Sequence, residues 1–514
     1  MSEYLDLAMF AAVAAGILLG YPVVFTLAGT AVLFAGLGWA TGHFDPGLYG
    51  ALSTRLFATM TNEVLIAIPL FVLMGVTLER SRIAEDLLEE MGKLLGALRG
   101  GLAVSVTLVG GLLAASTGIV GATVVTMALI SLPTMLRHGY SPRLAAGTVA
   151  SAGTLGQIIP PSTMLIILGE VMSAAYQQAQ FAMGKFSVET VSVGQLFAGA
   201  MVPGVLLMGL YCGYVLLAAR GSSSVARAES VVWGRLLRVL VPPIVLIVAV
   251  LGSILGGVAT PTEAASMGAV VAFLLAALRL APARNNLPVI AGGLALAVLL
   301  VMAGVLDLRL GRTTVGGAER AGIIIAAVLT LCTTVGLVAS LWRLNRDGTV
   351  GEILTGTLKI TAMIFAMMIG ASMFSLTFYG FGGDERVYEF LSNMPGGELS
   401  ALLFVMVLVF LLGFVLDFVE ICIIVIPVVA PILLQMGMEP VWLAVIIALN
   451  LQTSFLTPPF GYSLFYLRGA APPEVRTIDI YRGIIPFVLI QLAVIVLVYQ
   501  VPGLAVWLPA WLFG

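Results

Sequence analysis

The chain has 514 residues, of which 60% are hydrophobic and only 10% are charged, and its mean hydropathy is +1.11. Soluble domains carry about 25% charged residues, so this composition excludes a soluble globular protein and predicts many membrane-spanning segments. The net charge of −2 gives no indication of a nucleic-acid partner. The apolar runs show no period-2 alternation, which favours an all-α polytopic membrane protein over a β-barrel.

The first hundred residues, 1–100, are expected to supply scaffold helices and one helix that lies along the membrane. Residues 4–40 cross once or twice, because the motif GYP at 20–22 interrupts their apolar run. This run lacks a basic n-region and a cleavage site, so it is expected to be a retained span and not a signal peptide. A further span is expected at 62–80. The apolar stripe of 80–101 predicts an interfacial arm helix, with a soluble loop helix as the alternative.

Apolar length identifies further candidate spans along the rest of the chain. They lie at 141–176, 194–219, 237–256, 262–280, 288–306, 321–342, 352–378, 440–467 and 481–500. Two more apolar stretches, 101–137 and 399–437, are long enough to be interpreted as single long spans. The charged residues that flank them argue against that interpretation.

Arginines flank the stretch 101–137 at both ends, at Arg99 and at Arg137. Because cytoplasmic loops collect Lys and Arg, a re-entrant hairpin that keeps both ends on one side obeys the positive-inside rule. The acidic loop 379–398 is expected on the opposite side, so 399–437 must enter from the other face. The sequence therefore predicts two hairpins of opposite orientation.

Each predicted hairpin is followed by an apolar segment that a Pro-Pro pair interrupts, in GQIIPPS and in LTPPFG. When the sequence is aligned with itself so that Pro160 matches Pro458, other helix-breaking residues coincide as well. The aligned pairs are Pro133 with Pro431, Gly139 with Gly437, Pro142 with Pro440 and Pro161 with Pro459. We interpret this as an inverted internal repeat of a hairpin and a broken helix, an architecture that places substrate and ion sites near the membrane midplane.

The Pro-Pro pairs suggest how such sites form. Proline lacks an N–H and fixes φ, so it ends one half-helix and is well placed at the start of the next. Carbonyls of the unwound stretches 153–158 and 453–457 are then free to bind a cation, while the next half-helix, starting at Ser162 or Phe460, directs its positive end at an anion. The residues expected to contact substrate are Gln157, Pro160, Pro161, Ser162, Pro458 and Pro459.

The hairpin tips are expected near 114–121 and 415–421, and the second tip contains Asp417 and Glu420. Carboxylates inside a membrane are costly and therefore suggest function. For Asp417 the alternative is a cap on backbone N–H groups of the tip. For Glu420 the alternative is a protonated or water-exposed side chain.

Counter-charges are scarce where the two repeats would meet. Neither 101–136 nor 387–467 contains Lys or Arg, so an anionic substrate would be balanced by helix N-termini and bound cations, which predicts sodium coupling. The chain has only His43 and His138 as histidines, and it has no H-E-x-x-H, C-x-x-C or nucleotide-binding P-loop motif. Neither a metalloenzyme nor an ATP-driven pump is therefore expected. A channel or a structural scaffold is the alternative that leaves the paired helix breaks unexplained.

Several motifs, in order along the chain, resemble the large membrane subunit (DctM-type) of tripartite ATP-independent periplasmic (TRAP) transporters. They are IPLFVLMG at 68–75, LLGALRGGLA at 94–103, GTLGQIIPPS at 153–162, TPTEAASMGAV at 260–270, GFVLD at 413–417 and LTPPFGYSLF at 456–465. The stretch AASTGIVGATVV is most similar to the branch labelled mannitol or chloroaromatic, which is related to carriers of oxo-acids and lactate.

The resemblance implies a carrier of the bacterial inner membrane that works by an elevator mechanism and is driven by sodium ions. It also implies two partners, a small four-helix membrane subunit and a periplasmic substrate-binding protein. The binding protein would deliver a small organic acid, such as an oxo-acid or a lactate-like carboxylate. A stand-alone sodium symporter for divalent anions, with similar hairpins, is the alternative.

In such carriers each sodium ion lies between a hairpin tip and the break of the same half. The implied ligands are Ser116, Thr117, Gly153 and Thr154 in the first half, and Asp417, Asn450, Thr453, Ser454 and Thr457 in the second. The implied division of the chain is scaffold and arm helix at 1–100, first transport repeat at 101–176, scaffold and second arm region at 177–398, second transport repeat at 399–469, and C-terminal helix and tail at 470–514. This sequence departs from the family pattern in a longer loop at 177–193 and in an extra two-helix insert at about 285–347.

Overall fold

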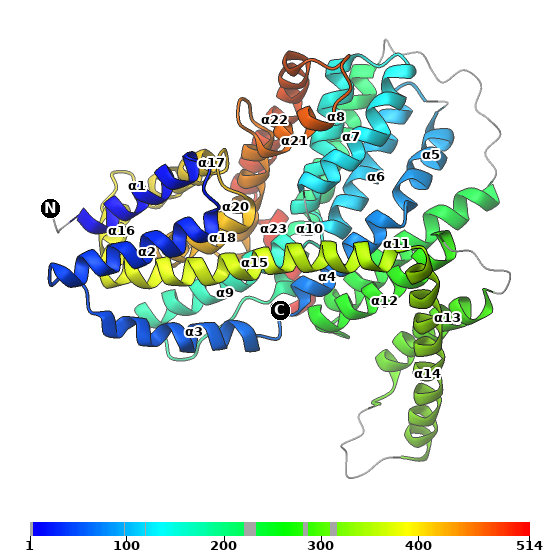
Figure 1. The fold of residues 1–514 in the computed structure, drawn as a ribbon, viewed down its shortest axis with the longest axis horizontal. Coiled ribbons are helices and arrows are strands. Elements are labelled where there is room, and N and C mark those ends of the chain that lie inside the picture. The colour runs from blue at the N-terminus through cyan, green and yellow to red at the C-terminus, as the bar shows by residue number, and fades with distance from the viewer. Residues whose placement is uncertain (1–3, 97, 119, 220–232, 281–285, 309–315) are drawn as a thin grey trace.

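The chain folds into helices joined by short turns (Figure 1). The computed structural model describes all residues except 1–3, 97, 119, 220–232, 281–285 and 309–315, and these described residues contain helices and no strand. Nine of the described helices are long and apolar enough to cross a membrane. The prediction of an all-α, polytopic membrane fold is confirmed.

The opening stretch forms two helices, α1 (Leu5–Leu18) and α2 (Val23–Ala40). They separate where Gly20 has a φ of 87° and Pro22 precedes the first residue of α2. A short 3-10 turn, η2 (Pro46–Tyr49), and the helix α3 (Gly50–Thr61) follow. The helix α3 was not predicted, because its 12 residues are too few to be recognised as an apolar span.

The predicted arm helix is present as α5 (Ile83–Leu95), which follows α4 (Ala67–Arg80). Its apolar residues Leu87 and Leu88 are buried, and α5 packs against α6 (Gly101–Thr117) and α11 (Trp233–Leu255). Protein therefore covers the apolar face of α5. Its position along the membrane stays a prediction.

The segment predicted as the first hairpin folds as two paired helices, α6 (Gly101–Thr117) and α7 (Val120–Arg137). The turn between them contains Gly118, whose φ of 65° is a conformation that favours glycine. The helix after it is broken, as predicted, but the stretch 153–158, expected to be unwound, is helical up to Gln157. It runs as α8 (Pro142–Thr154), tightens into the 3-10 turn η3 (Leu155–Gln157), and resumes after the proline pair as α9 (Thr163–Ala182).

The second hairpin differs from the first because its returning arm is itself bent. After α17 (Gly397–Leu412), the arm consists of α18 (Phe418–Ile424) and α19 (Ile426–Gln435), which meet at an angle of 58°. Pro427 lies in the first turn of α19, where its missing N–H ends the hydrogen-bond ladder of the preceding helix. The first hairpin has no proline at the equivalent place.

The second broken helix consists of α20 (Pro440–Leu456) and α21 (Tyr462–Ala470). Residues 453–456, expected to be unwound, instead form the last turn of α20. Its second half begins at Tyr462, so the expected start at Phe460 is wrong. The reason is the N-cap Gly461, whose N–H donates to the carbonyl of Thr457 and prolongs the turn after the break.

The two repeats pack into each other. The arms α6 and α7 contact α8 of their own repeat, and α17 contacts α20 of its own repeat. Each returning arm also reaches the other repeat, since α7 contacts α21 and α19 contacts α9. Every residue from Ala145 to Thr154 in α8 and from Val441 to Leu456 in α20 is buried. The half-helices that lead into the two breaks therefore lie inside the protein.

The remaining helices surround the repeats or extend from them. They are α10 (Val193–Ala218), α11 (Trp233–Leu255), α12 (Pro261–Leu280), α13 (Leu287–Val305), α14 (Gly317–Arg346), α15 (Thr349–Gly380), α16 (Gly383–Ser392), α22 (Thr477–Gln500) and α23 (Gly503–Phe513). The stretch after α22, expected as a tail, is the helix α23 and packs on α10.

The segment 285–347 contains the helix pair α13 and α14, which extends away from the rest of the molecule at the lower right of Figure 1. The two helices approach closely at Gly292 and Gly336. A Cβ atom added to Gly336 would lie 2.8 Å from the carbonyl oxygen of Pro288. Glycines at this crossing therefore allow the backbones to meet.

Candidate functional site

The first break is enclosed by the first hairpin. A Cβ atom on Gly156, in η3, would lie 2.1 Å from the backbone carbonyl of Ala114 in α6. A Cβ atom on Gly153 would lie 2.4 Å from a methyl carbon of Val124 in α7. Both contacts are shorter than carbon atoms tolerate, so only glycine allows the hairpin to lie this close to the break. Pro160 and Pro161 are buried here.

The first hairpin tip lies against the start of α9. A Cβ atom on Gly118 would lie 2.8 Å from the hydroxyl oxygen of Thr163, the first residue of α9. The backbones of Ser116 and Thr117 form the last turn of α6, and their side chains lie outside the described residues. The implied ligand Thr154 is buried, and its hydroxyl donates to the carbonyl of Ser151 at 2.9 Å.

Gln157 is the most unusual residue of the first break. Its side chain is fully buried, and neither its amide oxygen nor its amide nitrogen has a hydrogen-bond partner within the described part of the chain. Its backbone carbonyl accepts a hydrogen bond from the hydroxyl of Ser162 at 3.4 Å. An unpaired buried amide costs about 1–3 kcal/mol, so such a group suggests a binding role.

The second break is tied to its hairpin by two parallel hydrogen bonds. The amide nitrogen of Asn450 donates to the carbonyl of Met406 at 2.8 Å, and the hydroxyl of Ser454 donates to the carbonyl of Phe410 at 2.6 Å. Both donors lie one turn apart on α20 and both acceptors lie one turn apart on α17. A Cβ atom on Gly413 would lie 2.5 Å from the Ser454 hydroxyl, so the turn of the hairpin also reaches this point.

Two more implied ligands, Thr453 on α20 and Thr457 at its C-cap, donate their hydroxyl protons to carbonyls of α20. Thr453 donates to the carbonyl of Leu449 at 2.8 Å, and Thr457 donates to the carbonyl of Thr453 at 2.8 Å. A hydroxyl that donates its proton keeps two lone pairs as an acceptor. The hydroxyl oxygens at this break could therefore still coordinate a cation.

Asp417 is the N-cap of α18. Its carboxylate accepts from the N–H of Phe418 at 2.7 Å, while the carboxylate of Glu420 accepts from the N–H of Asp417 at 2.9 Å. Together they form a capping box. The capping alternative for Asp417 is thus present in the structure, and a cap leaves the remaining carboxylate oxygen able to bind a cation. The carboxylate of Glu420 faces back to the hairpin tip. Neither a functional role nor a protonated or water-exposed side chain, the two interpretations from the sequence, predicted this position.

The two breaks differ in exposure. Pro458 is half-buried, and Pro459 and Phe460 are exposed, whereas the proline pair of the first break is buried. The carbonyl of Pro459 accepts from the hydroxyl of Tyr481 on α22 at 3.0 Å. Both Pro-Pro bonds, Pro160–Pro161 and Pro458–Pro459, are cis.

Two features near the breaks were not predicted from the sequence. Gln452, on α20 just before the second break, is fully buried and has no partner for its side-chain amide among the described residues. The hydroxyls of Tyr462 and Tyr466 lie 3.1 Å apart on α21, and the Tyr466 ring lies against Gly121 near the first hairpin tip. The signal for Gln452 was present in the sequence as a lone amide in an apolar helix.

The first break thus has an unpaired amide and the start of α9. The second has three hydroxyls and an amide, and the carboxylate of Asp417 lies at the tip of its hairpin. Hydroxyl, amide and carboxylate oxygens of this kind suit an alkali cation, and helix starts suit an anion.

A family model and the most similar relatives indicate one family. A family model described as "Tripartite ATP-independent periplasmic transporter, DctM component" matches residues 10–504. The C4-dicarboxylate TRAP transporter large permease protein DctM of Vibrio cholerae is 27% identical over 98% of both chains. The protein of the same description from Pseudomonas aeruginosa is 25% identical over 91% of both chains. The crystal structure of the Alcanivorax borkumensis YdaH transporter has a TM-score of 0.54 at 16% identity, covering 90% of this chain and 88% of that one, which shows a shared fold.

Proposed function

The chain belongs to the family of DctM components of TRAP transporters, and from this premise we propose that it takes up a small organic acid by coupling its entry to sodium ions. As a member of this family it is a multi-pass protein of the inner membrane and a transporter subunit, not an enzyme. The family also implies a small membrane subunit and a periplasmic binding protein as partners.

The observation that carries the sodium proposal is the group of oxygens at the second break. Asn450 and Ser454 hold α20 against the hairpin arm, and Thr453 and Thr457 add hydroxyls on the same helix. Asp417 caps the helix that starts at the hairpin tip and supplies the negative charge. A sodium ion bound to these oxygens would hold the tip and the break together.

The first break is proposed to bind the acid and, through the backbone carbonyls beside its proline pair, a second sodium ion. Gln157 offers an unpaired amide N–H₂ inside the protein, and the start of α9 at Thr163 offers unpaired backbone N–H groups and a positive helix end. Both are donors that suit a carboxylate. Because this region contains no Lys or Arg between 101 and 136, binding of the anion would depend on bound sodium as counter-charge.

The proposed substrate is a small carboxylate of the oxo-acid or lactate type. The Vibrio and Pseudomonas relatives are described as C4-dicarboxylate permeases, so dicarboxylates such as succinate belong in the same test. The proposed movement is an elevator, in which α6–α9 and α17–α21 shift together against the remaining helices. Their mutual packing, α7 on α21 and α19 on α9, supports one moving body.

Uptake into proteoliposomes tests the proposal. The chain, reconstituted with the small membrane subunit, should accumulate labelled acid only with an inward sodium gradient and with the acid-loaded binding protein outside. Equal uptake when potassium replaces sodium would refute the coupling. Full sodium-dependent uptake without the binding protein would favour the stand-alone symporter.

A further inference from the structure

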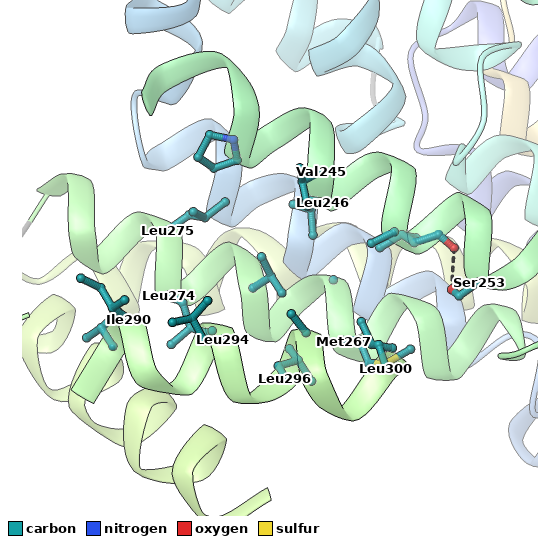
Figure 2. A pocket seen from close by; sticks show the side chains of 18 of the residues that line it. Val245, Leu246, Ser253, Met267, Leu274, Leu275, Ile290, Leu294, Leu296 and Leu300 are labelled. Atoms are coloured by element: carbon teal, nitrogen blue, oxygen red, sulfur yellow. Dashed lines mark hydrogen bonds between the residues drawn. The ribbon is translucent and has the colours of Figure 1, made fainter. Parts of the chain in front are cut away.

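A long apolar groove lies between α11, α12 and α13, outside the two repeats (Figure 2). It has a volume of about 410 Å³. Leu246, Val250 and Leu274 form part of its buried floor, whereas Val245 and Leu294 are 56% and 64% exposed at its rim. The groove is therefore open along the outer surface of the helices.

The lining of the groove offers no free polar group. Among the described residues that line it, Ser253 is the only polar one, and its hydroxyl donates to the carbonyl of Val250 within its own helix at 2.8 Å, as the dashed line in Figure 2 marks. An occupant of this groove must therefore be an apolar chain.

The length of the groove indicates what kind of chain fits. Its lining runs from Val289 to Leu300 on α13 and from Ala264 to Leu278 on α12, which correspond to about 17 Å and about 21 Å at 1.5 Å per residue. A partner helix that crosses the membrane needs about 30 Å, whereas one leaflet of hydrocarbon is about 15 Å thick. The groove thus suits one acyl chain better than a spanning helix.

Basic residues gather at one end of the groove. Arg238 lies one turn before Pro242, the first lining residue of α11, and is exposed without an acidic partner among the described residues. Arg279, next to Leu278, pairs with Asp86 of α5. By the positive-inside rule this end faces the cytoplasm. The charge of Arg238 is therefore available to an anionic group at the level of the lipid headgroups.

From this combination we propose that the groove binds an anionic phospholipid, with one acyl chain between α11, α12 and α13 and its phosphate at Arg238. The lipid fills the space between the insert helix α13 and the body of the protein. An apolar groove with a basic cytoplasmic end is the pattern by which membrane proteins recognise such lipids.

Gly293 provides a way to fill the groove. It lines the groove on α13, and a Cβ atom added to it would meet only Leu274, at an ordinary contact distance of 3.8 Å. Gly293→Phe therefore places a ring in the groove without a backbone clash. Gly304→Phe is the matched control on the same helix, since Gly304 lies outside the lining and has no atom within 4 Å of an added Cβ.

Native mass spectrometry of the purified full chain, titrated with phosphatidylglycerol or phosphatidylcholine, measures the binding. We expect one phosphatidylglycerol bound more tightly than phosphatidylcholine, and Gly293→Phe and Arg238→Gln to weaken it about tenfold, which corresponds to the loss of one good contact. The two control variants should leave the binding of phosphatidylglycerol unchanged; they are Gly304→Phe and Arg346→Gln. Arg346 lies 3.8 Å over the Trp342 ring. Because Arg238 is exposed, its variant reports on the lipid even where Gly293→Phe folds poorly.

Three results would overturn the proposal. The first is equal binding of both lipids by the unaltered chain. The second is unchanged phosphatidylglycerol binding in both Gly293→Phe and Arg238→Gln. The third is a disulfide crosslink between a cysteine at position 293 and the small membrane subunit in place of lipid. The last result would identify a protein helix as the occupant.

Discussion

The hydroxyl of Ser454 donates a 2.6 Å hydrogen bond to the backbone carbonyl of Phe410, which joins the second broken helix to its hairpin. Asn450 repeats the bond one turn earlier, to Met406. In the first repeat the equivalent contact is made by close packing of Gly156 on Ala114. The two repeats therefore use different chemistry to hold a hairpin tip beside a break.

The hydrogen bond of Ser454 can be tested by its removal. Ser454→Ala leaves the Phe410 carbonyl without its donor in a buried place and should lower the free energy of unfolding by about 1–3 kcal/mol. The half-saturating sodium concentration should also rise, because the proposed ligand is lost. Thr330→Ala is the matched control, since this exposed hydroxyl on α14 only bonds the carbonyl of Ala326 in its own helix. Thermal melts with and without sodium measure both effects, and equal behaviour of the two variants would contradict the prediction.

Gly156→Ala should separate the first hairpin from its break. The added methyl group would lie 2.1 Å from the Ala114 carbonyl, so the backbones must move apart at a cost of about 1–3 kcal/mol. Uptake should fall sharply in protein that still folds. Gly209→Ala on α10 is the control, because no atom lies within 4 Å of its added Cβ. Normal uptake and stability in Gly156→Ala would mean that this close contact is not needed.

Asp417→Asn separates capping from ion binding. Asn caps helices about as well as Asp, so stability should change by less than about 0.5 kcal/mol, whereas the loss of the charge should weaken sodium binding. Asp45→Asn serves as control, because Asp45 caps the turn η2 through Gly47 and lies outside both repeats. Sodium titration of tryptophan fluorescence or of thermal stability measures the change. If Asp417→Asn binds sodium normally, its carboxylate is only a cap.

Gln157→Leu should make the protein more stable and less active. Replacing an unpaired buried amide with an apolar side chain of similar size removes a desolvation cost of about 1–3 kcal/mol, and it also removes the donor proposed for the acid. Ser131→Ala is the control, since this buried hydroxyl on α7 also has no partner among the described residues but lies away from the break. It should gain stability without losing uptake. Unchanged half-saturating substrate in Gln157→Leu would exclude Gln157 from the site.

The hairpins and breaks could be predicted because their causes are local. Pro160, Pro161, Pro458 and Pro459 interrupt helices wherever they stand, and the arginines around 101–137 mark both ends of the first hairpin. The cap formed by Asp417 was also an alternative from the sequence, whereas the return of Glu420 to the tip was not predicted although its spacing is typical of a capping box. Local rules thus gave the elements and several of the site residues.

The contacts between elements could not be predicted in this way. Ser454 and Phe410 are far apart in sequence, and no local pattern tells which carbonyl a serine will meet. The bend at Pro427 and the greater exposure of the second break depend on how the repeats pack into each other. The unpaired state of Gln452 also follows only from its neighbours in space.

Sodium is proposed to bind at both helix breaks. Replacing Pro160 and Pro161 with Ala, and in a second variant Pro458 and Pro459 with Ala, should let each helix continue, since proline in a helix interior costs about 3 kcal/mol and alanine removes that obstacle. The carbonyls proposed as ligands would then enter the helix ladder.

Binding of radiolabelled sodium to purified, monodisperse protein tests this claim most directly. We expect each proline variant to bind less sodium than the unaltered chain, with the half-saturating sodium concentration raised about tenfold, equivalent to ~1.4 kcal/mol. Unchanged sodium binding in both variants, in protein that is well folded, would contradict it.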